Sequence, residues 1–474
     1  MNALVAVLHF VALGALGFGL AALCTRRSDG TPRGGLFLLS LAPGFAFVIN
    51  GCVAFARLYT GAFAVGTTTC AYVVLAAAVC LLCARRGAFP RQWCARTGPW
   101  SPIVRRIAIV GGIMCAVVWT ASIVNEPEGG SDAWQNWNLK ARFLWSAGAQ
   151  WRALFGPDVA VWNPNYPLLL PLNTAEGFTL AGDDSCLVPI AIATCFALAL
   201  ALLLLSACTE LGANAPTALC LLLVTPCFLP FATRQYADVE MSYFFLAGSV
   251  ALFFALRDAH VGDFFLAGVW ASAAAFTKNE GVPFALGIGA TALLSTVVAC
   301  ARARHARPAL RAIACAAGLA TVGWAWVLFN LRIAPQALAV GRGTVASLVL
   351  PPDWPARAGK TFLWIAEALA KPSMWALLPI ACAAAWFGTR APRSRERSAA
   401  GFAVVPLLLV LGAYCAFAVQ SSEDAEWLVT GSVGRVLFQL WPGFLFLAAA
   451  RTMARSDAGA SPERGFSTDT GGSA

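Results

Sequence analysis

Long apolar runs, separated by short charged connections, dominate this chain. Many of the runs approach the ~20 residues that a helix needs to cross a hydrocarbon core about 30 Å thick. The pattern therefore predicts an all-α polytopic membrane protein with about thirteen transmembrane helices. We expect these helices near residues 4–24, 36–57, 62–84, 107–124, 186–208, 215–231, 238–256, 263–277, 282–301, 311–333, 374–388, 399–418 and 435–452.

Composition supports this class. Of the 474 residues, 59% are hydrophobic and 12% are charged, and the mean hydropathy is +0.71. A soluble domain carries about 25% charged residues, so soluble, disordered and fibrous proteins are excluded. The net charge of +10 does not indicate a nucleic-acid partner, because the arginines are concentrated in alternate connections between the spans.

Those arginine-rich connections predict the topology. The positive-inside rule places them in the cytoplasm of a bacterial inner-membrane protein, with the N-terminus outside and the C-terminus inside. The large outer loops are then 125–185, 334–373 and 419–434. The arginines that set this orientation include Arg26, Arg27, Arg33, Arg85, Arg86, Arg302, Arg311, Arg395 and Arg397.

Three parts of the chain follow from this layout. Residues 1–106 form a three-helix addition with a basic cytoplasmic loop, and residues 107–452 form the transmembrane core. Residues 453–474 are small and polar, which predicts a disordered cytoplasmic tail.

The loop after the fourth span combines a carboxylate with aromatic rings and basic residues. A charged group beside a bilayer is costly to place, so Asp132 suggests chemistry. Residues 134–151 repeat apolar positions at an approximate helical period, which predicts an interfacial helix. The same composition is typical of an aromatic belt with snorkelling cations, and both interpretations stand. The candidate residues here are Asp132, Trp134, Trp137, Asn138 and Lys140.

A second cluster begins the span 238–256, directly after Arg234. Asp238 is well placed to cap this helix, because its carboxylate can accept free amide hydrogens and complement the helix dipole. Such a cap would explain Asp238 but not Glu240, which enters the helix two residues later.

A third cluster, Lys278, Asn279 and Glu280, forms the tip of a helical hairpin on the same outer side. Lys278 and Glu280 could neutralise each other, or Lys278 and the free amides of the next helix could hold a phosphate. Arg435, at the head of the last span, is either a boundary arginine or a guanidinium fork for a phosphate. We expect Asp132, Asp238 and Lys278 to meet in one cavity.

Short segments around these clusters also carry a family resemblance. They are residues 131–134, 137–141, 166–171, 237–238, 277–281, 435–437 and 439–442. Together they resemble the polytopic GT-C glycosyltransferases, in particular the bacterial relatives of protein O-mannosyltransferases and lipid A aminoarabinose transferases. The resemblance covers roughly residues 107–450. One departure is Ala133, which follows Asp132 where many members of that family have an Asp-Glu pair.

The resemblance implies a GT-C-type bundle. It also implies inverting transfer of a sugar from a polyprenyl-phosphate donor to a lipid, glycan or protein acceptor at the outer face. The resemblance maps catalytic carboxylates onto Asp132, which we expect to act as general base, and Asp238, and we expect Glu240 to assist them. It maps contacts with the donor phosphate onto Lys140, Lys278 and Arg435, and we add Arg234 to this set. We further expect Trp134, Trp137, Asn138, Tyr166, Asn279 and Glu280 to contact the sugar or the acceptor.

This chemistry requires no cofactor. The three histidines, His9, His260 and His305, are isolated from one another, so no zinc site is expected. Metal dependence stays open, because Asp132 and Asp238 could bind one divalent cation together if the two side chains approach each other. The alternative function is a transporter or flippase for a lipid-linked glycan. The ionisable residues gather at helix ends rather than at mid-membrane, which favours the enzyme.

Overall fold

The computed structural model describes residues 3–27, 29–61, 65–93, 101–156, 163–303, 308–334, 353–375, 379, 382, 394–420 and 425–451. These residues form helices and their connections, and the sole β-type pairing among them is a bridge between Arg26 and Pro32. The described cysteines are free thiols. The expected tail at 453–474 lies outside the described residues.

Ten described helices are long and apolar enough to cross a membrane, so the expected multi-pass membrane protein is confirmed. Their positions match most of the spans expected from the apolar runs. They are α1 (Ala3–Cys24), α2 (Gly35–Thr60), α3 (Val65–Arg85), α4 (Pro102–Asn125), α7 (Leu187–Leu211), α10 (Asp238–Asp258), α12 (Gly281–Ala303), α13 (Ala309–Leu328) with η3 (Phe329–Ile333), α18 (Ser394–Ala403) with α19 (Val405–Gln420), and α20 (Ala425–Arg451).

Three expected spans differ. The helix expected at 215–231 is two short helices, α8 (Ala215–Leu223) and α9 (Phe228–Thr233). Pro226 explains the break, because proline disfavours helical geometry in the residue before it. The span at 263–277 is α11 (Val261–Thr277), which has 17 residues and is shorter than the other spans. Most of the span at 374–388 lies outside the described residues.

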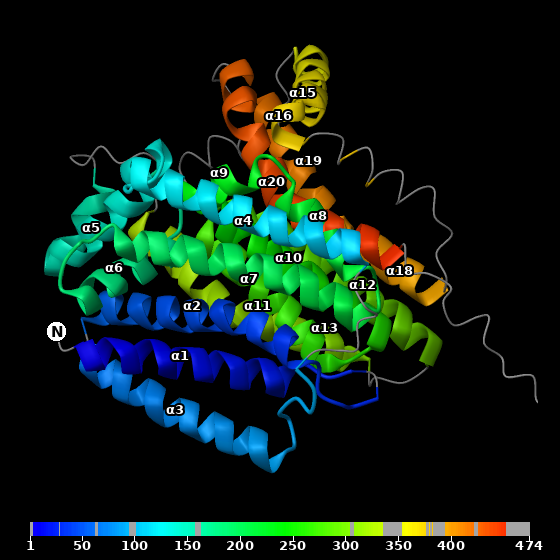
Figure 1. Cartoon of the computed structure of the whole chain (residues 1–474), viewed down its shortest axis with the longest axis horizontal. Helices are drawn as coiled ribbons and strands as arrows, with labels where there is room; N and C mark the ends of the chain where they lie inside the picture. The colour runs from blue at the N-terminus through cyan, green and yellow to red at the C-terminus, as the bar shows by residue number, and fades with distance from the viewer. Residues whose placement is uncertain are drawn as a thin grey trace, which may run out of the picture.

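α10 is the central helix of the bundle. It packs against α7, α11 and α20, and residues along its whole length are buried. α4, by contrast, lies at the periphery and contains no buried residue (Figure 1). A helix that is apolar on all sides is stable in either place, inside a protein core or against lipid.

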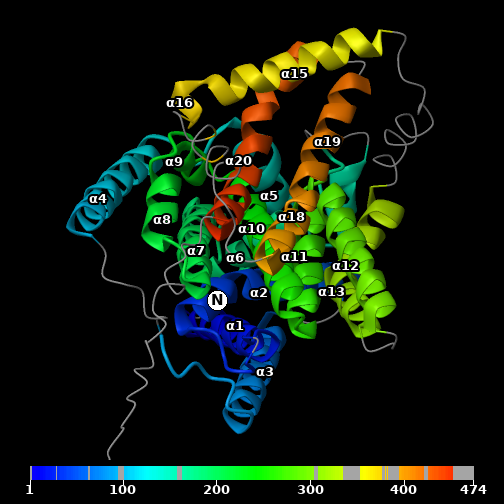
Figure 2. The same cartoon turned by 90° about the vertical axis from the view of Figure 1, so that its right-hand side faces the viewer.

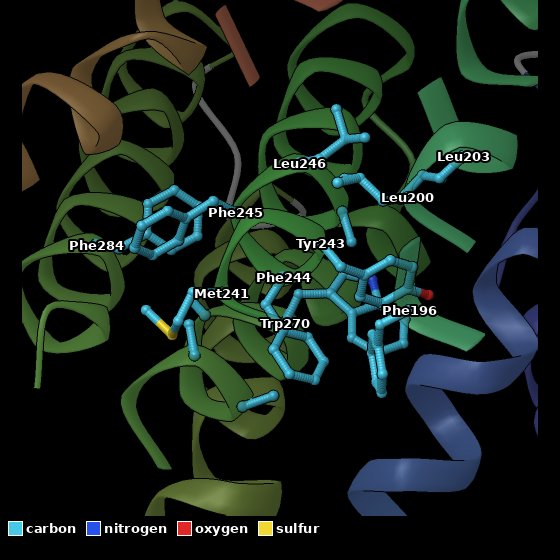
Figure 3. Close-up of a cluster of buried hydrophobic side chains, with 14 of the residues drawn as sticks. Phe196, Leu200, Leu203, Met241, Tyr243, Phe244, Phe245, Leu246, Trp270 and Phe284 are labelled. Atoms are coloured by element: carbon cyan, nitrogen blue, oxygen red, sulfur yellow. The ribbon is translucent and has the colours of Figure 1, made fainter. Parts of the chain in front are cut away.

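Aromatic side chains pack α10 against its neighbours (Figure 3). Phe244 stacks on Trp270 of α11, with the ring centroids 6.2 Å apart. Tyr243 meets Phe196 of α7 edge to face at 5.2 Å, and Phe245 meets Phe284 of α12 at 4.6 Å. Because these rings come from four helices, the position of the first turns of α10 relative to its neighbours is set by packing.

The two ends of α10 carry different charged clusters. With 21 residues, the helix is about 30 Å long, close to the hydrocarbon thickness of a bilayer. At its last turn, buried Arg33 lies 3.6 Å from Asp258 and 3.1 Å from Asp263. An arginine-rich connection therefore lies at that end, and Asp238 lies at the opposite end.

Candidate functional site

Arg435 joins the first and second predicted clusters. Its Nη2 donates to Oδ2 of Asp132 at 2.5 Å, and its Nε donates to Oδ2 of Asp238 at 2.7 Å. The guanidinium carbon also lies 4.7 Å from the ring centroid of Tyr236. One planar cation therefore holds two carboxylates that come from separate parts of the chain.

Lys278 and Gln439 complete the surroundings of Asp238. Lys278 Nζ lies 3.2 Å from Oδ1 of Asp238 and 2.9 Å from Glu280, and Gln439 Nε2 donates to the same Oδ1 of Asp238. Burial alone would lower the pKa of Lys278, but the carboxylates of Asp238 and Glu280 outweigh it and raise that pKa. The three clusters thus meet at one place, but Asp238 and Lys278 are buried there and do not share an open cavity with Asp132 as expected.

The expected capping role of Asp238 is wrong. Asp238 is the first residue of α10, the cap position is Ala237, and no side-chain capping hydrogen bond forms there. The side chain of Asp238 is fully buried, and its oxygens are taken by Lys278, Arg435 and Gln439. Asp238 therefore positions the basic groups around it.

A junction between two loops brings Asp132 to this place. The Gln235 side chain accepts from Asn138 Nδ2 at 2.9 Å and donates to the carbonyl of Pro127 at 2.9 Å. Gln235 has a left-handed backbone, with φ of 57°, which is uncommon outside glycine and marks a constrained position. Gly130 donates to the carbonyl of Arg234 at 3.1 Å. A side chain at Gly130 would collide with the Tyr236 ring.

The expected interfacial helix is a chain of short helical segments. A π-helical turn, η1 (Ala133–Trp137), leads into α5 (Asn138–Ser146) and then the 3₁₀ helix η2 (Gly148–Phe155). This turn aims the indole of Trp137 back at Asp132, with Nε1 2.9 Å from Oδ2. The π-helical turn follows from no pattern in the residues, although such turns are frequent at functional sites.

Tyr166 connects this segment to the hairpin. Its ring stacks on Trp137, with centroids 5.3 Å apart and planes 4° from parallel. Lys278 Nζ lies 5.6 Å and Lys140 Nζ 5.8 Å from the ring centroid of Tyr166. Both lysines are therefore close to the Tyr166 ring.

Lys140 lies in an enclosed position. It is fully buried, and its Nζ donates to the carbonyl of Asn163 at 2.7 Å and to that of Tyr166 at 3.5 Å. Burial lowers the pKa of Lys140 to about 7, an effect that Asp132 only partly offsets. This lysine ties down the turn before α6 (Leu169–Ala181) and does not line the pocket described next.

An open pocket of about 290 Å³ lies against Asp132 and Arg435, and we call it the Arg435 pocket. Arg234, also expected at the site from the sequence, lines it as well. Its far wall comes from α15 (Trp354–Ala370) and the residues after it, which cross over α19 and α20 (Figure 2). Its charged and aromatic lining comprises Asp132, Phe231, Arg234, Tyr236, Trp364, Glu367, Lys371 and Arg435.

Several of these residues were not among those expected from the sequence. Lys371, Glu367 and Trp364 lie in an expected outer loop far along the chain, and no motif marks them. The one signal in the sequence concerned Lys371. All four lysines fall on the expected outer side, against the positive-inside trend, which suggests a functional role.

The other expected residues lie around the site without lining the pocket. Trp134 is about half exposed. Asn138 is buried and bonded to Gln235, and Glu280 is bonded to Lys278. Asn279 lies in the hairpin turn, where its carbonyl accepts from Val282. Glu240 is buried, and its Oε2 accepts no hydrogen bond from a described residue.

The guanidinium of Arg435 lies between Asp132 and Asp238, where a shared cation would have to bind. A metal ion there would compete with Arg435 for the same oxygens. No three His, Cys, Asp or Glu side chains come together as a metal site within the part of the chain that the structure describes.

Comparison with known proteins adds no relative: no protein-family model, curated protein or solved structure matches this chain. The site therefore has to be interpreted from its own geometry.

Proposed function

We propose that this chain is an inverting glycosyltransferase that moves a sugar from a polyprenyl-phosphate donor to a lipid, glycan or protein acceptor. The observation that supports it most is the contact between Asp132 and Arg435 on the wall of an open pocket. A carboxylate suited to accept a proton and a guanidinium suited to bind phosphate lie side by side there.

The charges of the Arg435 pocket suit a phosphate. Three cations, Arg435, Arg234 and Lys371, face two acids, Asp132 and Glu367, so the lining carries one net positive charge. Arginine binds phosphate through two parallel hydrogen bonds. The lining also includes a tyrosine and a tryptophan, whose rings can pack against a sugar or a prenyl chain.

The proposed step is a single displacement. The acceptor hydroxyl oxygen attacks the anomeric carbon, its proton passes to Asp132, and the bond from that carbon to the phosphate oxygen breaks. The electron pair leaves with the polyprenyl phosphate, whose growing charge Arg435 stabilises. Donor phosphate would compete with Asp132 for the guanidinium, so binding of the donor would free the carboxylate to act as the base.

Asp238 and Lys278 would act from behind Arg435. Both are almost fully buried, so they position the guanidinium rather than touch the substrate. Trp137 would orient the Asp132 carboxylate through its indole N–H.

The same proposal extends to the fold and the location. We propose a GT-C-type bundle of about thirteen spans in a bacterial inner membrane, with the Arg435 pocket facing outward. The arginine-rich connection at the opposite end of α10 supports this orientation under the positive-inside rule.

An assay with purified protein in detergent tests the proposal. The protein is incubated with a polyprenyl-phosphate sugar and membrane glycolipid, and free polyprenyl phosphate is measured by mass spectrometry. A transferase releases polyprenyl phosphate and forms a new glycoside. A flippase, the alternative, neither releases polyprenyl phosphate nor forms a glycoside. If no donor sugar tested gives either product, the proposed transferase activity is overturned.

A further inference from the structure

A second pocket, of about 600 Å³, opens between the end of α2 and the helices α5, η2 and α6. We call it the Arg152 pocket. Its walls come from the last turns of α2, from α5 and η2, and from α6, which lie together in Figure 1. Its volume falls within the ~300–1,000 Å³ typical of small-molecule sites. No residue lines both this pocket and the Arg435 pocket.

Three aromatic residues line this pocket. They are Tyr59, Trp145 and Trp151, and Tyr59 and Trp145 are partly exposed. Rings that combine an apolar face with a polar edge suit a ligand that has both, such as a sugar, whose C–H face packs on the ring.

The charged residues of the pocket leave one positive charge unbalanced. Arg57 Nη1 lies 2.7 Å from Oε1 of Glu176, and their side chains are 17% and 6% exposed. This pair neutralises itself and provides fixed polar groups for hydroxyls. Arg152 is exposed and forms no ion pair within the described residues. Its guanidinium carbon lies 4.6 Å from the Trp151 ring centroid and 5.6 Å from that of Tyr59.

The pocket lies near the end of a transmembrane helix. α2 has 26 residues and is about 39 Å long, longer than the ~30 Å hydrocarbon core. At least one end of α2 therefore extends beyond the hydrocarbon core, and Arg57 and Tyr59 in its last turns are residue types that suit the lipid headgroup level. A ligand here is met at the membrane surface.

We infer that the Arg152 pocket binds an anionic sugar, a saccharide ring that carries one carboxylate. The rings of Tyr59 and Trp145 hold the sugar face, Arg57 and Glu176 bond to hydroxyls, and Arg152 binds the carboxylate through charge-assisted hydrogen bonds. The sugar can come from a glycolipid headgroup or from a soluble saccharide. This inference does not depend on the proposed transferase activity.

Binding to the full-length protein in nanodiscs tests the inference. Saturation-transfer-difference NMR is run with glucuronate, with uncharged glucose and with inorganic phosphate, and affinities are obtained by titration. A second arm places glucuronosyl diacylglycerol in the nanodisc and measures displacement of glucuronate. Displacement by the lipid identifies the glycolipid as the source, and its absence identifies the soluble saccharide.

We expect glucuronate to bind at least about tenfold more tightly than glucose or phosphate, and its ring protons to receive saturation. Arg152→Ala should weaken glucuronate binding about tenfold or more, equivalent to about 1.4 kcal/mol. Trp145→Ala should weaken glucuronate binding and reduce the saturation that its ring protons receive. Arg142→Ala, on the neighbouring helix α5 but paired outside the pocket with Glu128 and Asp184, should bind as the wild type does.

Three outcomes would overturn the inference. They are failure of glucuronate to bind in either soluble or lipid-linked form, unchanged binding by Arg152→Ala, and phosphate binding as tightly as glucuronate. Asp132→Asn should bind glucuronate normally, so a failed transferase assay and a failed binding assay remain distinguishable.

Discussion

Arg435 and Asp132 are 303 positions apart in the chain, and their side chains are in contact at 2.5 Å. The contact links α20 to the loop that follows α4, at the edge of an open pocket. Both side chains are partly exposed, at 22% and 17%, so a ligand in the pocket can reach them. An ion pair open to a ligand can exchange partners, which is the basis of the first two predictions.

Asp132→Asn should abolish transfer while the protein still folds. Asparagine keeps the shape of the side chain but cannot take up the acceptor's proton, and general-base catalysis contributes about 10²–10⁴-fold. Release of polyprenyl phosphate by purified protein measures the loss. Asp184→Asn is the control, because Asp184 is paired with Arg142 away from the pocket. Full activity of Asp132→Asn would remove Asp132 as the base.

Arg435→Lys should lower kcat/KM for the donor by about 10²-fold, the scale of a lost transition-state donor. An ammonium keeps the charge but cannot match the flat guanidinium, whose two nitrogens hold Asp132 and Asp238 at 2.5 and 2.7 Å. Steady-state kinetics over a range of donor concentrations provide the test, with Arg142→Lys as the matched change elsewhere. If the two variants behave alike, the guanidinium geometry of Arg435 is not required for transfer.

Lys278→Met should destabilise the fold. It leaves the fully buried Asp238 without one of its cations, and removing one partner of a buried pair costs about 3–5 kcal/mol. The double variant Asp238→Asn/Lys278→Met should recover part of that loss, because the stranded charge is gone. Unfolding in mixed micelles with increasing SDS measures both.

Glu280→Gln is the comparison for that cycle. Glu280 also pairs with Lys278, but its side chain is 20% exposed, so the loss should stay below about 1 kcal/mol. Strictly additive effects in the Asp238 and Lys278 cycle would mean that the two side chains do not stabilise each other.

The apolar runs predicted most of the transmembrane helices because length and hydropathy are local properties. The helix break after α8 was missed, although Pro226 lies inside the expected span at 215–231 and gives a local signal for it. The local hydropathy pattern did not predict which helices are buried inside the bundle. α4 and α10 are both apolar spans, yet α4 has no buried residue and α10 is buried along its length.

The candidate site was predictable in part. Charged residues at helix ends indicated Asp132, Asp238, Lys278 and Arg435, and the structure brings them together. Two kinds of information were missing from the sequence. Burial separates Lys140 from the pocket, and long-range folding brings in a lysine from an expected outer loop. Both depend on contacts between distant segments, which residue type and spacing do not encode.

Lys140 predicts a pH dependence of stability. Burial lowers its pKa from 10.5 to about 7 in the folded protein. Between these values the unfolded chain holds the proton and the folded chain does not, so unfolding takes up a proton and rising pH opposes it. The contribution of Lys140 to stability should therefore rise with pH from about 7 to 10.5 and stay flat below about 7.

Comparison of the wild type with Lys140→Met isolates this contribution. Methionine also removes the hydrogen bonds to the carbonyls of Asn163 and Tyr166, which lowers stability by a similar amount at every pH. The difference in unfolding temperature between the two proteins should thus be constant from about pH 6 to 7 and grow in favour of the wild type up to about pH 9. Parallel curves over the whole range would show that Lys140 keeps its proton in the folded state.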